Sequence, residues 1–339
     1  MPKNKKCRQI KCVYKRIDDI FSLKILHIPF FCSTFVGEMN TIGQIVRFTD
    51  FGESHGVAVG GVLDGVPSQL KIDFAAIQHD LDRRAGRVVE SGTSDSGECL
   101  PVSKRAQGEK DEIEWLSGLL DGVTLGSPIA FIIRNTNARP EDYEALKDVY
   151  REGHADRVYE QKYGIRDYRG GGRASARETV ARVVAGGIAK QILAKDGITV
   201  EGQLVQIGEE TDRTKFAALL EDVQRAGESV GGVVECRIKG VKPGLGEPIF
   251  DKLQARLAYA VMSINGCRSF EVCDRDANGQ SVSCGIVGGI SDGNDIVFRC
   301  RFKATATKMK EYGGRHDVCI AVRAVPIVEA MAALVIVDN

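Results

Sequence analysis

The most restrictive feature of the sequence is a run of three glycines, Gly170 to Gly172, with an arginine on either side. Apolar residues at helical spacing follow in residues 180–195, so the glycines stand just before a helix. The N–H groups and the dipole at the start of a helix attract anions, and arginines add bidentate contacts to phosphate or carboxylate. Five arginines in residues 166–182, interleaved with small residues, therefore predict a folded anion pocket.

The same segment has a second interpretation that requires no ligand. Ser175 and Glu178 have the spacing of a capping box, in which both side chains satisfy N–H groups at the start of a helix. This structural role is compatible with a binding role at the same helix end, and the sequence leaves both open.

The remainder of the chain predicts strands and helices without regular alternation. Strands are expected at residues 43–51, 128–134, 230–241 and 295–303, and helices at 73–84 and 180–195. Residues 114–123 fit a short helix or a turn, residues 326–337 a buried helix or strand, and the polar segment 90–108 a loop. This pattern indicates an α+β fold with several antiparallel strand pairs.

Charge and length exclude several classes of protein. The 339 residues carry 46 basic and 46 acidic side chains, so no overall field attracts nucleic acid or an anionic membrane. No apolar run approaches the ~20 residues that a membrane helix needs. Residues 1–38 hold eight basic and three acidic groups, and we expect them to be an extension outside the fold, which begins at Met39.

Cysteine and histidine patterns do not predict a metal site. The ten cysteines include no C-x-x-C pair, which favours buried free thiols in a reducing cytoplasm. The five histidines form no H-E-x-x-H motif and no cluster with carboxylates. We therefore expect no bound metal.

Residues 52–56 read Gly-Glu-Ser-His-Gly and follow a predicted strand. They match the G-x-S-x-G elbow of serine hydrolases, but only fifteen residues separate Met39 from Ser54, too few for the strands and oxyanion loop that such an elbow needs. The glycines could instead let the backbone approach a flat or anionic ligand, with His55 as a proton donor near neutral pH. An inert turn is the third interpretation.

Residues 314–317 read Gly-Arg-His-Asp, a motif that is weakly specific alone but belongs to a longer series. The series resembles the chorismate synthase family, and its eight motifs occur in family order across residues 39–338. They are a start like Met39 to Gly43, GESHG at 52–56, DLDRR at 80–84, GHAD at 153–156, YGIRDYRGGGR with SARET at 163–179, GLGEP at 244–248, MSIN at 262–265, and GRHD with RAVPI at 314–327.

The resemblance implies a fold, a reaction and a cofactor. The implied fold is a single β-α-β sandwich from residue 39 onward, with helices between antiparallel sheets, assembled as a cytoplasmic homotetramer. The implied reaction converts 5-enolpyruvylshikimate 3-phosphate to chorismate and phosphate by a 1,4-anti elimination that requires reduced FMN. The phosphate and two carboxylates of this substrate would occupy the predicted anion pocket.

The resemblance also assigns roles position by position. His55 matches a histidine that protonates the reduced flavin, His154 one that assists phosphate departure, and Asp317 an aspartate that relays the abstracted proton. Ser54 and Ser175 match serines that organise this relay. The implied substrate-binding arginines are Arg83, Arg84, Arg151, Arg177, Arg315 and Arg173. The implied cofactor contacts are Ser175, Ala176, Gly285, Lys303, Thr305 and Thr307.

The chain also departs from the family pattern. From Met39 onward it is short for the family, and a loop that in relatives ends in the flavin-contacting Asn-His-Ala-Gly-Gly is reduced to residues 267–289. Two alternatives therefore remain open: a degenerate family member that keeps the anion pocket but binds flavin poorly, and a binding protein for phosphorylated metabolites without chemistry. Flavin affinity separates both from the catalytic interpretation.

Overall fold

In the computed structural model, the described residues are 40–88, 100, 108, 110–136, 138–273, 283–305 and 317–339. Several predictions concern residues outside these ranges. They are the extension at 1–38, nearly all of the polar loop at 90–108, and the site residues Thr307 and Arg315.

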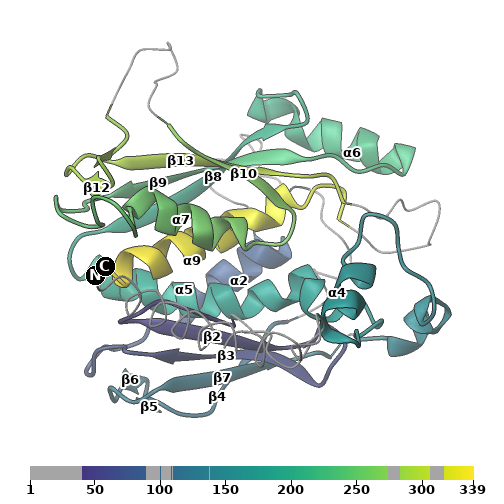
Figure 1. Cartoon of the computed structure of the whole chain (residues 1–339), viewed down its shortest axis with the longest axis horizontal. Coiled ribbons are helices and arrows are strands. Elements are labelled where there is room, and N and C mark those ends of the chain that lie inside the picture. The colour runs from purple at the N-terminus through teal and green to yellow at the C-terminus, as the bar shows by residue number, and fades with distance from the viewer. Residues whose placement is uncertain are drawn as a thin grey trace, which may run out of the picture.

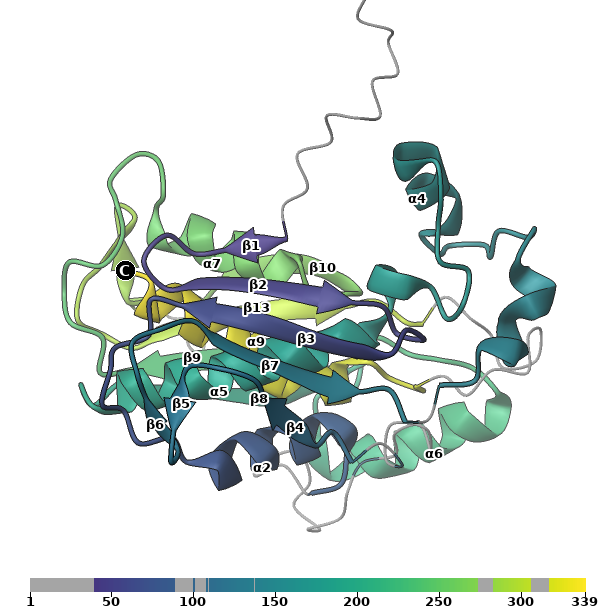
Figure 2. The ribbon, with the colours of Figure 1, turned by 90° about the horizontal axis from the view of Figure 1, so that it is seen from below.

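Two antiparallel sheets enclose a layer of helices (Figure 1). The first sheet has the order β1-β2-β3-β7-β4 and faces the viewer in Figure 2. Its strands are β1 (Thr41–Ile42), β2 (Arg47–Gly52), β3 (Ala58–Asp64), β7 (Ile129–Arg134) and β4 (Ile113–Trp115). The second has the order β10-β13-β9-β8, formed by β10 (Cys267–Val272), β13 (Ile296–Phe302), β9 (Gly232–Lys239) and β8 (Thr199–Ile207).

Four helices fill the space between the sheets: α2 (Phe74–Ala85), α5 (Thr179–Ala194), α7 (Leu253–Met262) and α9 (Ala321–Val337). Helix α5 packs on α9 and on β3, whereas α9 packs on β8 and β9. Apart from Arg323 and Glu329, helix α9 is apolar on all sides, and it is almost entirely buried, as expected for a helix at the centre of a core. The predicted α+β sandwich is therefore confirmed.

The remaining elements lie around this sandwich. They are helices α4 (Asp156–Tyr163) and α6 (Phe216–Ala226), the 3-10 turns η2 (Pro140–Leu146), η3 (Gly172–Ala174), η4 (Ala176–Glu178) and η5 (Arg213–Lys215), and the strand pairs β5 (Leu119–Leu120) with β6 (Val123–Thr124) and β11 (Ile286–Val287) with β12 (Ile290–Ser291). None of the helices in these described ranges is long and apolar enough to cross a lipid bilayer.

Local sequence signals explain where the first helix of the layer begins and ends. The Asp73 side chain accepts a hydrogen bond from the N–H of Ala76 at 3.0 Å, which caps the start of α2. Gly86 adopts a left-handed conformation (φ 67°) and ends the helix. The helix predicted at 73–84 is thus confirmed almost to the residue, and α5 confirms the one predicted at 180–195.

Two sequence-based assignments require correction. Residues 114–123, predicted as a short helix or turn, contribute to β4, β5 and β6. The edge strand β4 pairs with β7, and Trp115 packs between Phe74 and Phe131 at ring-centroid distances of 5.4 and 5.7 Å. Of the strand predicted at 43–51, residues 43–46 form the turn between β1 and β2, and the strand begins only at Arg47. Of the two states considered for 326–337, the helix is correct, and α9 already begins at Ala321.

Helices α5 and α9 cross with almost no space between them. A Cβ atom at Gly186 would lie 2.2 Å from the Cβ of Ala330 and 2.3 Å from its Cα. At the neighbouring Gly187 the nearest atom would be the Cγ1 of Ile77 at 3.0 Å, which belongs to a side chain that can rotate. The helix crossing therefore requires glycine at position 186.

We expect Gly186→Ala to lower the free energy of unfolding by about 1–3 kcal/mol relative to Gly187→Ala, the usual cost of overpacking. Both variants gain the same helix propensity, up to about 1 kcal/mol, so the difference isolates the steric conflict with α9. Urea denaturation of both variants measures it. Equal unfolding midpoints would show that the crossing can widen.

A buried group of charges connects three helices and a strand of the second sheet. Glu329 on α9 binds Arg83 of α2 through two hydrogen bonds of 2.8 Å and Lys190 of α5 at 2.5 Å. It also accepts the N–H of Gly202 in β8 at 2.8 Å, while Asp80 binds both Arg83 and Lys190. Glu329 is 3% exposed, so these partners replace the water that its charge has lost.

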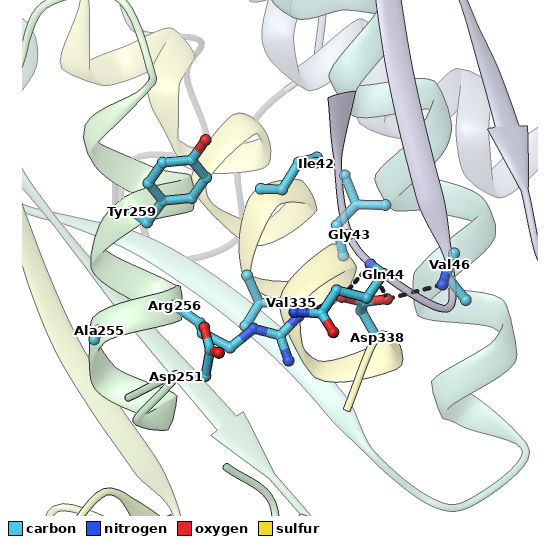
Figure 3. Close-up of a pocket in the computed structure, with 11 residues that line it drawn as sticks. Ile42, Gly43, Gln44, Val46, Asp251, Ala255, Arg256, Tyr259, Val335 and Asp338 are labelled. Atoms are coloured by element: carbon cyan, nitrogen blue, oxygen red, sulfur yellow. Dashed lines mark hydrogen bonds and ion pairs between the residues drawn. The ribbon is translucent and has the colours of Figure 1, made fainter. Parts of the chain in front are cut away.

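A second carboxylate fastens the end of α9 to the first sheet (Figure 3). Asp338 accepts the N–H groups of Gln44, Ile45 and Val46 at 2.6–2.9 Å and pairs with Arg256 of α7. These contacts form one wall of a pocket of about 410 Å³ between α7, α9 and the turn before β2. The turn is thereby held by a residue almost 300 positions away in the chain.

Candidate active site

The Gly-Glu-Ser-His-Gly motif forms the turn between β2 and β3. Ser54 and His55 are buried, and the Ser54 hydroxyl lies 3.0 Å from Nδ1 of His55. Tyr143 contacts the His55 ring edge-on at a centroid distance of 4.7 Å. Because this turn joins two strands, it is not the strand-to-helix elbow of serine hydrolases, and the hydrolase interpretation is wrong.

Asn135, directly after β7, holds this turn in place. Its side-chain N–H groups donate to the carbonyl oxygens of Glu53 at 2.9 Å and Gly56 at 3.0 Å, and its oxygen accepts from Nε of Arg177 at 2.9 Å. The histidine turn is therefore linked to the segment that leads into α5.

The three-glycine run brings the two histidines of the site to one place. Gly170 and Gly171 have φ angles of 67° and 92°, which favour glycine. A Cβ at Gly170 would lie 2.2 Å from the ring of His55, and one at Gly171 would lie 2.6 Å from the ring of His154. The backbone can thus approach both imidazoles only because it carries no side chains here. We call this segment, Gly170–Gly172, the glycine turn.

His154 is held by a buried ion pair at the start of α4. Its Nδ1 lies 2.7 Å from Oδ1 of Asp156, and Arg151 binds both oxygens of the same carboxylate at 2.9 Å. Burial raises the pKa of Asp156, but the hydrogen bonds from His154 and Arg151 outweigh it and hold that pKa well below its usual range. Asp156 is therefore ionised in the folded protein.

The arginines around the helix start are paired with carboxylates that the sequence analysis did not identify. Asp111 binds both Arg84 and Arg177, and Asp50 binds Arg173. Each of the other arginines in residues 166–182 also has an acidic partner: Arg166 has Glu160, Arg169 has Asp167, and Arg182 has Glu178. Half-buried guanidinium groups need such counter-charges, so the predicted anion pocket consists of arginines already held in place by carboxylates.

Glu178 has the most unusual carboxyl group of this cluster. Burial raises its pKa; the charge of Arg182 opposes this and that of nearby Asp50 adds to it, with a result of about 7. The capping box is only half formed, because Ser175 accepts the N–H of Arg177 at 3.4 Å while Glu178 turns to Arg182 at 2.9 Å. Glu178 can thus hold or release a proton near neutral pH.

Asp317 is connected to the start of α5 through two arginines. Its carboxylate accepts from Arg323 at 2.7 Å, and Arg323 also donates to the carbonyl oxygen of Arg84 at 2.9 Å. Arg84 in turn donates to Thr179, the first residue of α5, at 3.3 Å. Thr305 donates to the carbonyl oxygen of Asp317 at 3.2 Å.

Two residues assigned by the resemblance lie away from this cluster. Arg83 points into the helix layer, where Glu329 binds it through both oxygens. Gly285 lies against Asp295 and Ile296 at the beginning of β13, whereas Lys303 and Thr305 follow the end of that strand, about 20 Å away by strand length. The chain 283–285 folds back there, since Ser283 binds Asp292 at 2.5 Å. Gly285 therefore does not share a site with Lys303.

The start of α5 carries two of the residues that the resemblance assigns to the cofactor. Ser175 and Ala176 lie at the helix start, and Asn265 donates to the carbonyl oxygen of Ala174 at 3.0 Å. The Oδ1 atom of Asn265 is buried without a hydrogen-bond partner in the described residues. Asn265, Ala176 and Arg323 line a narrow space of about 10 Å³. A buried acceptor of this kind suits the N–H group of a heteroaromatic ring. Lys303 is tied to the same region through Gly266.

Sequence reasoning missed the residues that hold the others in position, namely Asn135, Asp111, Asp50 and Glu178 in its role as an arginine partner. Asn135 has one usable signal, since a polar residue directly after an apolar strand often reaches a site. Asp111 has none, because its contacts with Arg84 and Arg177 depend on the packing of three separate segments.

The described residues contain no group of three or more histidine, cysteine or acidic side chains that could hold a metal. The six described cysteines are all free; Cys236, Cys267, Cys300 and Cys319 are buried, whereas Cys273 and Cys284 are partly exposed. Free thiols were expected from their spacing, and those within the described ranges agree with that prediction.

Comparison with known proteins shows which family has this fold and these motifs. The chorismate synthase family model matches residues 46–339. A chorismate synthase of Christiangramia forsetii is 42% identical over 353 aligned positions, covering 88% of this chain and 96% of that protein. One of Flavobacterium psychrophilum is 40% identical with the same coverage. A crystal structure of chorismate synthase has a TM-score of 0.66 at 27% identity, covering 88% of this chain and 92% of that one.

The site gathers two imidazoles and several arginines near the start of one helix. Fold and site together define an enzyme of the lyase class that acts on a phosphate-bearing substrate. The chain belongs to the chorismate synthase family. The alignments extend over 353 positions although the chain has 339 residues, so relatives contain segments that this chain lacks. The shortened loops noted in the sequence are consistent with this difference.

Proposed function

We propose that this chain converts 5-enolpyruvylshikimate 3-phosphate to chorismate and inorganic phosphate by 1,4-anti elimination. The single observation that carries the proposal is the approach of His55 and His154 to adjacent glycines of the glycine turn, in a chain of this family. Two imidazoles at one position can move protons near neutral pH, which an elimination with a phosphate leaving group requires.

The roles of the side chains follow from their surroundings. His154 donates a proton to the departing phosphate, and His55, supported by Ser54, holds a proton on the cofactor side. Asp317 takes part in removing the substrate proton, with Arg323 hydrogen-bonded to its carboxylate. Arg84, Arg151, Arg173 and Arg177 bind the phosphate and carboxylates, and Arg315 is proposed to join them. Ser175 organises the proton relay at the helix start.

Reduced FMN is proposed as the cofactor, held by Ser175, Ala176, Lys303, Thr305 and Thr307. When bound, it supplies an electron transiently and recovers it, so that the reaction causes no net oxidation. The protein's task is to orient the substrate, exclude water and keep the arginines in place. The unpartnered Oδ1 of Asn265 adds this residue to the proposed contacts.

Anaerobic mixing of the purified chain with chemically reduced FMN and 5-enolpyruvylshikimate 3-phosphate tests the proposal. Chorismate absorbance and phosphate release are followed together, and we expect equal amounts of both. Substrate binding without product would identify a degenerate member that has kept the anion pocket and lost the flavin site. Absence of both binding and product would contradict the proposal itself.

We also propose that the enzyme works as a cytoplasmic homotetramer whose partners are its small-molecule substrate and other copies of itself, not nucleic acid or membranes. The balanced charge of the chain supports the last part of this proposal, because a net charge of zero gives no general attraction to nucleic acid or anionic membranes.

Deletion of residues 1–38 is expected to leave turnover and the melting temperature unchanged. The reason is that the family match begins at residue 46 and that residues 39–43 already resemble the start of the family's sequences. Steady-state kinetics and thermal melting of the shortened chain check this. Loss of soluble, active protein would show that these residues belong to the fold.

A further inference from the structure

His154 and Arg151 both contact the carboxylate of Asp156, and these contacts bear on where the imidazole carries its hydrogen. Asp156 is the first residue of α4, and its side chain turns back to the loop that carries Arg151 and His154. Oδ1 of Asp156 lies 2.7 Å from Nδ1 of His154 and 2.9 Å from Nη2 of Arg151, whereas Oδ2 receives Nε and the backbone N–H of Arg151 at 2.9 and 3.1 Å. The carboxylate is 4% exposed.

These distances decide which ring nitrogen of neutral His154 carries hydrogen. An ionised carboxylate accepts hydrogen bonds but cannot donate one. If Nδ1 lacked its proton, its lone pair would face the Asp156 oxygen at 2.7 Å, which is repulsive. Nη2 of Arg151 also lies 3.1 Å from Nδ1 of His154. The two nitrogen atoms are close because both donate a hydrogen bond to Oδ1 of Asp156. The hydrogen is therefore on Nδ1.

The opposite edge of the ring faces the glycine turn. A Cβ at Gly171 would lie 2.6 Å from Cε1 and 2.9 Å from Nε2 of His154. We propose that Asp156 is a positioning residue that holds neutral His154 in the Nδ1–H tautomer, so that Nε2 exchanges the proton on the side of the glycine turn, and that Arg151 fixes Asp156 for this task. The catalytic part of this inference rests on the proposed function, in which His154 protonates the leaving phosphate.

The arrangement has a simple chemical consequence. The N–H bond at Nε2 of the imidazolium breaks, the proton forms an O–H bond with the departing phosphate, and the neutral ring remains with hydrogen on Nδ1. Nε2 then takes up the next proton without a change of tautomer. Asp156 and Arg151 face the ring at Nδ1, and His55 lies across the glycine turn.

The tautomer can be measured without any turnover. In the full chain labelled with ¹⁵N-histidine and kept without substrate or flavin above pH 8, we expect the His154 signals of a protonated Nδ1 and an unprotonated Nε2. The signals are assigned by their loss in His154→Gln. A protonated Nε2 in the wild-type chain would overturn the inference, even if the chain forms chorismate. If the chain forms no chorismate, the proposed function fails while this measurement still decides the tautomer.

Two substitutions separate the hydrogen bond from the charge. Asp156→Ala removes both, so we expect the Nε2–H tautomer to become populated. Asp156→Asn keeps an acceptor but removes the charge, so the pH profile of kcat should change while the Nδ1–H tautomer persists. The loss of kcat in either variant is bounded by that of removing His154, about 10²–10⁴-fold.

Glu160 provides a matched control on the same helix, because it pairs with Arg166 at 2.9 Å. Glu160→Gln should leave the ¹⁵N signals of His154 unchanged. Wild-type tautomer and pH profile in both Asp156 variants would contradict a positioning role for Asp156. Equal changes in the Glu160 control would show that any loss of charge at α4 disturbs the ring, which also contradicts it.

Discussion

Replacing His154 by alanine is expected to reduce chorismate formation by about 10²–10⁴-fold, the usual contribution of a general acid. The side chain meets the glycine turn with one edge and the Asp156 carboxylate with the other, so its removal leaves the leaving phosphate without its proposed proton donor. The Arg151–Asp156 pair does not depend on the imidazole, and the surrounding fold should persist. Single-turnover phosphate release with saturating reduced FMN measures the effect on the chemical step.

His79 provides the control for this substitution. It lies on the exposed side of α2, and its replacement by alanine should leave turnover unchanged. If His154→Ala turns over as fast as His79→Ala, His154 has no part in the mechanism. Unchanged substrate affinity together with slow turnover in His154→Ala would assign the residue to chemistry rather than binding.

The largest effect on stability is expected from Glu329→Gln, which should lower the free energy of unfolding by about 3–5 kcal/mol, the cost of removing one partner from a buried ion pair. The amide can still accept the N–H of Gly202, but the two positive charges of Arg83 and Lys190 are then balanced by the single carboxylate of Asp80. Urea denaturation monitored by circular dichroism measures the loss. Glu201→Gln is the matched control, because Glu201 pairs with Lys239 at 2.8 Å on the surface, and at most about 1 kcal/mol is expected there.

This prediction has a defined dependence on pH. Burial raises the pKa of Glu329, but Lys190 and Arg83 more than compensate and hold it at about 2, below the value of ~4.3 in an unfolded chain. A depressed pKa contributes stability that is complete above about pH 4.3 and is lost as the pH falls toward 2. The difference between wild type and Glu329→Gln should therefore narrow over this range. A difference that is constant from pH 6 to pH 2.5 would mean that the Glu329 charge is not what stabilises the helix layer.

Sequence patterns predicted the parts of the fold whose signals are local. The α2 helix has both its cap residue and its terminal glycine in the sequence, and α5 has a clear helical period. The prediction for the segment around Trp115 was wrong because its strands are short. They are stabilised by the packing of Trp115 between Phe74 and Phe131 rather than by an alternating pattern in their own sequence. Edge strands of two or three residues leave too little alternation for any periodicity to be read.

The candidate site was predicted in its chemical groups but not in their partners. The motifs predicted that histidines and arginines would gather near the glycine turn, and His55 and His154 do so. Pairing across the chain could not be predicted, because Asp111 meets Arg177 from 66 residues away and Asp50 meets Arg173 from 123 away. For the same reason Arg83, one of two adjacent arginines in one motif, turned toward Glu329 while its neighbour turned toward Asp111.

The position of α9 in the chain determines how this protein can fold during synthesis. Helix α9, on which α5 and the second sheet pack, is made after the strands of both sheets, and Asp338, which fastens the turn before β2, follows it. The first sheet and α5 are therefore made long before the helix that joins them to the second sheet, and the apolar side of α5 that contacts α9 must wait for it. Such long-range closure makes folding slow and exposes intermediates to aggregation, so we expect the growing chain to depend on chaperones more than a protein assembled from local units.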